Sequence, residues 1–186
     1  KHELNFIELK WTKDLDLKNL TSTISNTLLT DEEVTFLNKK ENIKMCVDPS
    51  WLPFEQIEDN KHKGMVAEII KVYEDKLNFP IKLIETSSWD ETLQFAKERK
   101  CDIVSAAVST SKRKEYLNFT KPYLKFPQVI VTREKEPFID DFEDIAIKRI
   151  GVVKNSAVVE LLKNKYPNIN LVNVNDVADG LFKVSS

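Results

Sequence analysis

From residue 43 onward, short apolar runs rich in β-branched residues alternate with longer stretches in which apolar residues recur every three or four positions. The short runs predict β-strands and the longer stretches predict helices, an alternation typical of a parallel sheet with crossover helices. The predicted strands are IKMCV (43–47), IKLIE (81–85), DIVSAAV (102–108), QVIVT (128–132), RIGVV (149–153) and INLVNV (169–174).

The predicted helices lie between these strands. Residues 64–78 place five apolar side chains on one stripe, and Asn78 and Pro80 end that helix. Residues 88–100 predict a second helix, with Ser88 or Asp90 as the residue that caps its N-terminus. Residues 156–167 and 175–184 continue the alternation, so the fold class is α/β.

The first 40 residues follow a different pattern. They contain no predicted strand, and residues 1–28 are interpreted as a lead-in or linker. Thr30 and Glu33 form a capping box that opens a short amphipathic helix through Leu37. A second boundary is predicted near residues 133–144, where charge density rises. We therefore predict a first lobe over 29–133, and the hinge and first part of a second lobe over 134–186. The second lobe is incomplete because it holds only two strands.

Composition excludes several classes of function. The 186 residues carry 28 basic and 30 acidic side chains, with no concentrated basic face, so we expect no nucleic-acid partner. No apolar run approaches the roughly 18 residues of a membrane span, and the first residues lack the apolar block of a signal peptide. These features favour either a cytosolic protein or an excised segment of a longer one.

The sequence offers little cofactor or metal chemistry. Cys46 and Cys101 each lie in or beside an apolar run, which favours buried free thiols over a disulfide or a reactive site. His2 and His62 are the two histidines, and neither has a cysteine or histidine at metal-ligand spacing. We find no phosphate-binding loop and no dinucleotide fingerprint, and we therefore expect neither a cofactor nor a metal.

The residues that follow the predicted strands are the candidate site, because ligands of an open parallel sheet bind outside the carboxyl ends of its strands. They offer aromatic rings, hydroxyl groups, one arginine and one helix start: Trp51 and Phe54; Ser87, Ser88 and Trp89; Ser109, Thr110, Ser111 and Arg113; and Asn155 or Ser156.

Together these groups are typical of a pocket for a small molecule with a carboxylate, because the arginine fork matches two carboxylate oxygens. Each group also has a structural interpretation. Arg113 can be a solvated surface charge, Trp51 and Trp89 can be packing residues, and the hydroxyls of 109–111 can cap a helix. Their gathering at one end of the sheet favours the binding interpretation.

Three motifs occur in the order DPSWLPFE (48–55), SWDE (88–91) and RKEYLNFTKPY (113–123). With this order, residues 29–186 closely resemble the bacterial extracellular solute-binding proteins of family 3. The resemblance is nearer to the Venus-flytrap sensors of membrane-bound signalling proteins, notably sensor histidine kinases, than to free transport receptors. It implies a periplasmic-binding-protein-like (type II) fold, in which two α/β lobes joined by hinge strands close on a ligand. Because such sensors can carry tandem modules, it also allows residues 1–28 to be the tail of a preceding module.

The resemblance also implies roles for individual residues. Arg113 stands where the family's arginine clamps a ligand carboxylate, and Trp51, Phe54 and Trp89 match its aromatic walls. Asn155, Ser156 and Ala157 match the helix-opening turn that donates to the carboxylate. Val108 replaces a serine or threonine that the family's amino-acid receptors usually carry, and Ala106 lies two positions earlier. Their lack of hydroxyl groups puts classical amino-acid binding in doubt.

The leading functional hypothesis is an extracytoplasmic sensor domain that binds an amino-acid-like or other small carboxylate and signals by lobe closure to a transmembrane kinase or cyclase. The resemblance implies membrane anchoring through the rest of the protein and allows a homodimer of the full receptor. The alternatives are the binding protein of an amino-acid ABC transporter and a ligand-free mechanical or interaction module. No nucleophile with a base is identifiable, so we expect no catalysis in this domain.

Overall fold

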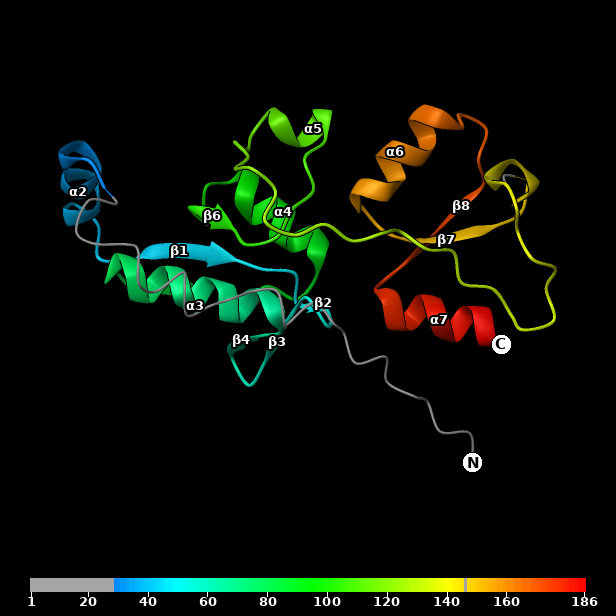
Figure 1. Ribbon diagram of the computed structural model, residues 1–186, viewed down its shortest axis with the longest axis horizontal. Helices are drawn as coiled ribbons and strands as arrows, with labels where there is room; N and C mark the ends of the chain where they lie inside the picture. Colours follow the sequence, from blue (N-terminus) through cyan, green and yellow to red (C-terminus); the bar gives the residue numbers. More distant parts are fainter. Residues whose placement is uncertain (1–28, 146) are drawn as a thin grey trace. The chain divides into compact units, whose positions relative to one another are not determined.

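The computed structural model describes residues 29–145 and 147–186 (Figure 1). By compactness the chain divides into residues 1–41 and 42–186, and each unit is described by itself. In the first unit, helix α2 (Asp31–Asn38) begins with the predicted capping box, because Thr30 accepts from the Glu33 backbone N–H and Glu33 accepts from the Thr30 backbone N–H. The predicted lead-in, residues 1–28, lies outside the described residues, and the predicted lobe boundaries remain predictions.

The second unit begins with a parallel three-stranded sheet in the order β5 (Ile81–Leu83), β1 (Ile43–Cys46), β6 (Ile103–Val104). β1 aligns Ile43 with Ile81 on one side and Met45 with Ile103 on the other. The first strand is therefore central, and the chain crosses to opposite sides of it in two successive crossovers. In open parallel sheets such a reversal of strand order marks the edge where ligands bind, and we call the loops at the carboxyl ends of these strands the crevice loops.

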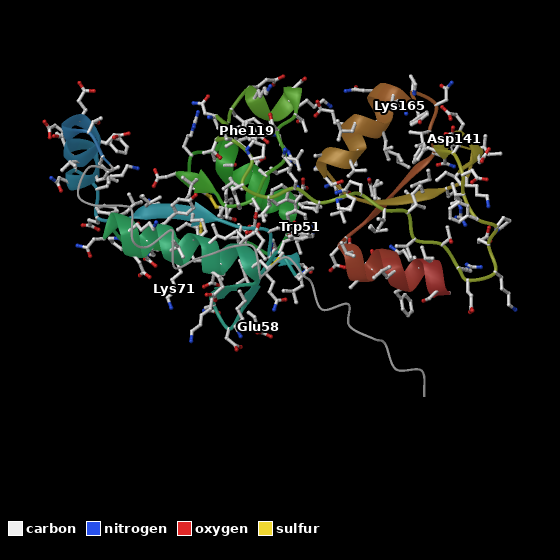
Figure 2. The ribbon with its side chains drawn as sticks, viewed as in Figure 1. Trp51, Glu58, Lys71, Phe119, Asp141 and Lys165 are labelled. Carbon is white, nitrogen blue, oxygen red and sulfur yellow. A yellow bond between two sulfur atoms is a disulfide. The ribbon has the colours of Figure 1, made fainter. Side chains whose placement is uncertain are left out.

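Two helices cover this sheet, and both confirm the predicted pattern. α3 (Met65–Leu77) buries Val66 and ends at Asn78 in the left-handed conformation. Lys71, labelled in Figure 2, lies on its exposed face. α4 (Trp89–Lys97) is capped by the Ser88 side chain, and it packs against β1 and β6. The buried core of this part comprises Met45, Cys46, Val47, Val66, Trp89, Leu93, Ala96 and Cys101.

Cys46 and Cys101 form a disulfide, with 5.8 Å between their Cα atoms. The favoured interpretation of two free thiols was therefore wrong. The two cysteines are 55 residues apart in sequence, but the strand pairing of β1 with β6 brings Cys46 and the residues before β6 together. A pairing set by tertiary structure cannot be read from the local apolar pattern around each cysteine.

A small antiparallel sheet interrupts the first crossover and was not predicted. It consists of β2 (Ser50–Trp51), β3 (Glu55–Glu58) and β4 (Lys61–Lys63), and Figure 2 labels Glu58 near its hairpin turn. These strands are two to four residues long and mostly polar, so they lack a hydrophobic period. Gly64 follows with a φ of 106°, and a Cβ there would lie 2.5 Å from the Phe54 carbonyl oxygen. This position therefore requires glycine.

Glu55, the first residue of β3, is completely buried. One carboxylate oxygen accepts from the Asp48 backbone N–H at 2.9 Å, and the other lies 3.2 Å from His62 Nε2 and accepts from the Ser105 hydroxyl. These contacts join the loop after β1, strand β4 and the end of β6. The buried carboxylate therefore fixes the crevice loops relative to one another.

A long connection follows α5 (Ser111–Lys114) and contains the 3₁₀-helix η2 (Phe142–Ile145). The predicted strand at 128–132 was wrong: these residues form no strand, and Val129, Ile130 and Val131 are 76%, 45% and 52% exposed. A strand needs a neighbour to pair its backbone groups, and no segment of the described residues forms a ladder with this one.

The second sheet pairs β7 (Ile150–Val153) in parallel with β8 (Leu171–Val174). α6 (Ala157–Lys165) and α7 (Val177–Ser185) both contact β7, and Figure 1 shows them on opposite sides of the two strands. We refer to residues 42–114 as the first-sheet region and to residues 149–186 as the second-sheet region. Among the described residues, none of the helices is both long and apolar enough to cross a lipid bilayer.

Candidate ligand-binding site

An aromatic cluster stands beside the loop after β1. Trp51, labelled in Figure 2, lies with its ring centroid 4.6 Å from that of Phe54. Phe126, from the long connection, lies 4.4 Å from Phe54 and 5.5 Å from Trp51. The predicted pair Trp51 and Phe54 is therefore a cluster of three rings, and the third comes from a segment that the sequence did not connect with the site.

Arg113 is buried, with only 5% of the residue exposed, so its interpretation as a solvated surface charge was wrong. Its guanidinium carbon lies 5.2 Å from the centre of the Trp89 ring. Nη1 donates to the Val108 carbonyl at 2.9 Å, and Nη2 donates to the Asn155 carbonyl at 3.0 Å. Burial lowers the pKa of Arg113, an effect that Tyr116 and Glu160 oppose. The guanidinium nevertheless stays charged at neutral pH, because an arginine pKa starts so high.

The position of Arg113 depends on α5. The Thr110 hydroxyl accepts from the Arg113 backbone N–H at 3.3 Å and so caps this short helix. Thr110 is therefore a helix cap, as one interpretation of the hydroxyl cluster predicted. By fixing the backbone of the first turn, the cap directs the Arg113 side chain toward Trp89 and the second-sheet region.

Asn155 meets the first-sheet region through its backbone as well as its side chain. Its carbonyl accepts from Arg113 and, at 3.4 Å, from the Trp89 indole N–H. Its φ of 55° is left-handed, a conformation that asparagine tolerates better than most residues. That turn places the carbonyl against the arginine just before α6 begins.

Charged groups bring the same two regions together. The Asp90 carboxylate, in the first turn of α4, accepts from Lys154 Nζ at 2.7 Å and from the Asn155 side-chain amide. Glu160, on α6, accepts from the Ser111 backbone N–H at 3.1 Å. The pKa of Asp90 is lowered, chiefly by its hydrogen bonds from Lys154 and Asn155.

The remaining predicted site residues are less involved in these contacts. Val108 is exposed and takes part through its carbonyl, while Ala106 is half-buried. Ser156 precedes α6 but its side chain makes no capping hydrogen bond, and Ala157 is buried in the first turn. Their ligand-binding roles remain predictions.

The structure adds Asp90, Phe126, Lys154 and Glu160 to the residues around the site. Asp90 was considered only as a helix cap, although it stands next to Trp89 at a strand end. That position was a signal that could have identified it. Phe126 carries no such signal, because it lies in a connection without hydrophobic periodicity. Glu160 carries none either, because the sequence does not tell which face of α6 turns toward the first-sheet region.

No group of three or more potential metal-binding side chains occurs within residues 29–145 and 147–186. Around Arg113 the structure brings together the Trp89 ring, the turn before α6 and the Asp90–Lys154 pair. An arginine fork beside an aromatic ring is chemically suited to an anionic group with an attached body.

The sequence pattern of the bacterial extracellular solute-binding proteins, family 3, matches residues 43–181. The virulence sensor protein BvgS of Bordetella pertussis is 23% identical over 145 residues, which cover 77% of this chain and 12% of BvgS. A probable histidine-binding protein of Campylobacter jejuni is 27% identical over 116 residues, which cover 62% of this chain and 45% of that protein.

A solved structure, the periplasmic VFT2 domain of Bordetella pertussis BvgS, has a TM-score of 0.72 at 22% identity. The match covers 84% of this chain and 67% of that one. This likeness concerns the fold. The chain spans about an eighth of BvgS and less than half of the histidine-binding relative.

Proposed function

Because the chain belongs to the bacterial extracellular solute-binding proteins of family 3, we propose that it binds a small carboxylate-bearing molecule between its two lobes. Its fold is the periplasmic-binding-protein-like Venus flytrap, and it is an extracytoplasmic domain. The Cys46–Cys101 disulfide agrees with that location, because disulfides persist in oxidising compartments.

The observation that carries this proposal is the burial of Arg113 where the two sheet regions meet. A buried guanidinium must find acceptors, and one donor of its fork already bonds a carbonyl of the second-sheet region. A ligand carboxylate in place of that carbonyl would accept two parallel hydrogen bonds and gain the ionic attraction as well. The aromatic residues Trp89 and Trp51 would then wall the rest of the ligand.

The proposed role is that of a sensor. Binding would change the separation of the lobes, and the rest of a receptor would carry that change across the membrane to a kinase or cyclase. The similarity to BvgS, a sensor protein, supports this role. Membrane anchoring through the remainder of the protein and assembly as a homodimer belong to the same proposal.

A second candidate function is solute capture for an amino-acid ABC transporter. The specific observation in its favour is the similarity to a probable histidine-binding protein. A ligand-free mechanical module is the third candidate, because Val108 and Ala106 offer no hydroxyl donors beside Arg113. In all three the domain itself is proposed to be non-catalytic.

A thermal-shift screen of the 186-residue chain against amino acids and small carboxylates tests the proposal. A ligand at 100 times its dissociation constant adds about 2.7 kcal/mol of stability, or about 5–10 °C in a chain of this size. We expect Arg113→Ala to abolish the shift. Arg113→Lys should weaken it strongly, because lysine keeps the charge but loses the fork.

Arg149→Ala is the matched control, since Arg149 is an exposed arginine of the second-sheet region. It should leave the ligand shift intact. A ligand that stabilises the wild type, Arg113→Lys and Arg113→Ala equally contradicts the carboxylate role of Arg113. If no compound shifts the wild type, the ligand-free module replaces the binding proposal.

A further inference from the structure

The Glu160 side chain, on α6 of the second-sheet region, reaches a backbone N–H group near Arg113. Its Oε1 accepts from the Ser111 backbone N–H at 3.1 Å. Ser111 lies two residues before Arg113 in the first turn of α5, so the carboxylate of α6 sits against the same turn that positions the arginine.

The hydrogen bonds from Thr110, the strongest influence, and from Ser111 and Lys112 lower the pKa of Glu160. The Lys112 ammonium acts in the same direction, and the carboxylate in turn helps Arg113 to remain charged. Glu160 is therefore ionised at neutral pH. Its contribution is present above the ordinary glutamate pKa and is lost as the pH falls through the lowered value.

We propose that Glu160 is a built-in carboxylate that holds the first-sheet and second-sheet regions together without a ligand and competes with an external carboxylate at Arg113. We call the hydrogen bond from the Ser111 backbone N–H, in the first turn of α5, to the Glu160 carboxylate the Glu160 latch. The competition rests on the proposed function, because it assumes that ligands bind at Arg113. The latch itself does not depend on that assumption.

Two other contacts favour the same arrangement. Nη2 of Arg113 already donates to the Asn155 carbonyl, so a ligand oxygen would have to replace that carbonyl. Asp90 pairs with Lys154 across the same two regions. The chain thus satisfies with its own groups the donors that a carboxylate ligand would need. A ligand must displace them, and its apparent affinity falls accordingly.

The test compares the unliganded wild type with Glu160→Gln by NMR and small-angle X-ray scattering. In the wild type, the Ser111 amide resonance should titrate with Glu160, at a pH below the usual glutamate value. Glu160→Gln should remove this titration and increase the radius of gyration, because a neutral amide no longer attracts the cationic turn. Glu98→Gln is the control, since Glu98 pairs with Lys100 inside the first-sheet region and should change neither property.

A titration with acetate measures the competition. Acetate should bind Glu160→Gln at least about threefold more tightly than the wild type, consistent with removal of an internal competitor. An unchanged Ser111 titration together with an unchanged radius of gyration in Glu160→Gln overturns the latch. If acetate binds neither protein while both ligand-free properties change, the latch stands and the carboxylate site at Arg113 fails.

Discussion

At the scale of single residues, the pKa of Asp48 is strongly shifted by its surroundings. It follows β1, and its carboxylate accepts from the Ser50 backbone N–H at 3.0 Å. Burial raises its pKa to about 6, while the Ser50 N–H opposes the shift and the negative charges of Glu55 and Asp176 add to it. Asp176 belongs to the second-sheet region and also accepts from the Ser50 hydroxyl at 3.4 Å. Two carboxylates of different regions therefore approach the same serine.

We predict that Asp48→Asn stabilises the chain at pH 7. The folded state holds a proton on Asp48 up to about pH 6, whereas the unfolded state releases it near the ordinary value of 3.8. Stability from this group is therefore highest at low pH and is lost as the pH rises between these values. The substitution removes the buried charge but keeps an oxygen for the Ser50 N–H, which corresponds to at most about 3 kcal/mol.

Urea unfolding at several pH values between 4 and 7 measures this effect. The gain should be largest at pH 7 and nearly absent at pH 4. Asp75→Asn, on the exposed face of α3, is the control and should show no such trend. If Asp48→Asn instead lowers the free energy of unfolding by the same amount at every pH, the charged Asp48 carboxylate is not destabilised by its surroundings.

Which site residues could be predicted depended on where they lie in the sequence. Arg113 and Trp89 each follow a predicted strand, so the rule for strand ends identified them without coordinates of any kind. The contact of Asn155 with Arg113 was not predicted, because the oxygen that meets Arg113 is a backbone carbonyl and carries no signal in the residue type. The ligand-binding role of Asn155 stays a prediction. Glu160 could not be predicted, since its partner amide lies 49 residues away.

Among the helices and strands, length and periodicity decided the outcome. α3 has a full apolar stripe and was predicted to within two residues, whereas β2 has two residues and no pattern. The run at 128–132 has the composition of a strand but no partner within the described residues. The local hydrophobic pattern therefore predicted helices that pack one apolar face on a sheet. It failed for segments whose structure depends on pairing with another strand.

The disulfide gives an element-level prediction, because it joins the end of β1 to the segment before β6. Replacing both cysteines by alanine should lower the free energy of unfolding by about 4 kcal/mol, the chain-entropy value for a loop of this length. Thermal unfolding of the double variant, and of the wild type with and without a reductant, measures the loss. Equal melting temperatures with and without the reductant would contradict a stabilising cross-link.

For the whole molecule, the family and the α/β fold followed from the order of three motifs and the strand–helix alternation. What sequence could not predict is how many contacts the two sheet regions make directly. Arg113, Trp89, Asp90 and Ser111 of the first-sheet region all bond residues of the second. In the proposed function, a ligand bound between two regions that already touch would act by changing their separation.

Calorimetric titration of the 186-residue chain with a carboxylate identified by the screen, and with the primary amide of the same compound, tests whether the crevice recognises a carboxylate through Arg113. We predict that the amide binds the wild type at least about tenfold more weakly, a difference of about 1.4 kcal/mol. In Arg113→Lys the difference should shrink, and in Arg113→Ala it should vanish. Equal binding of acid and amide to the wild type, or a difference that survives in Arg113→Ala, would contradict carboxylate recognition by Arg113.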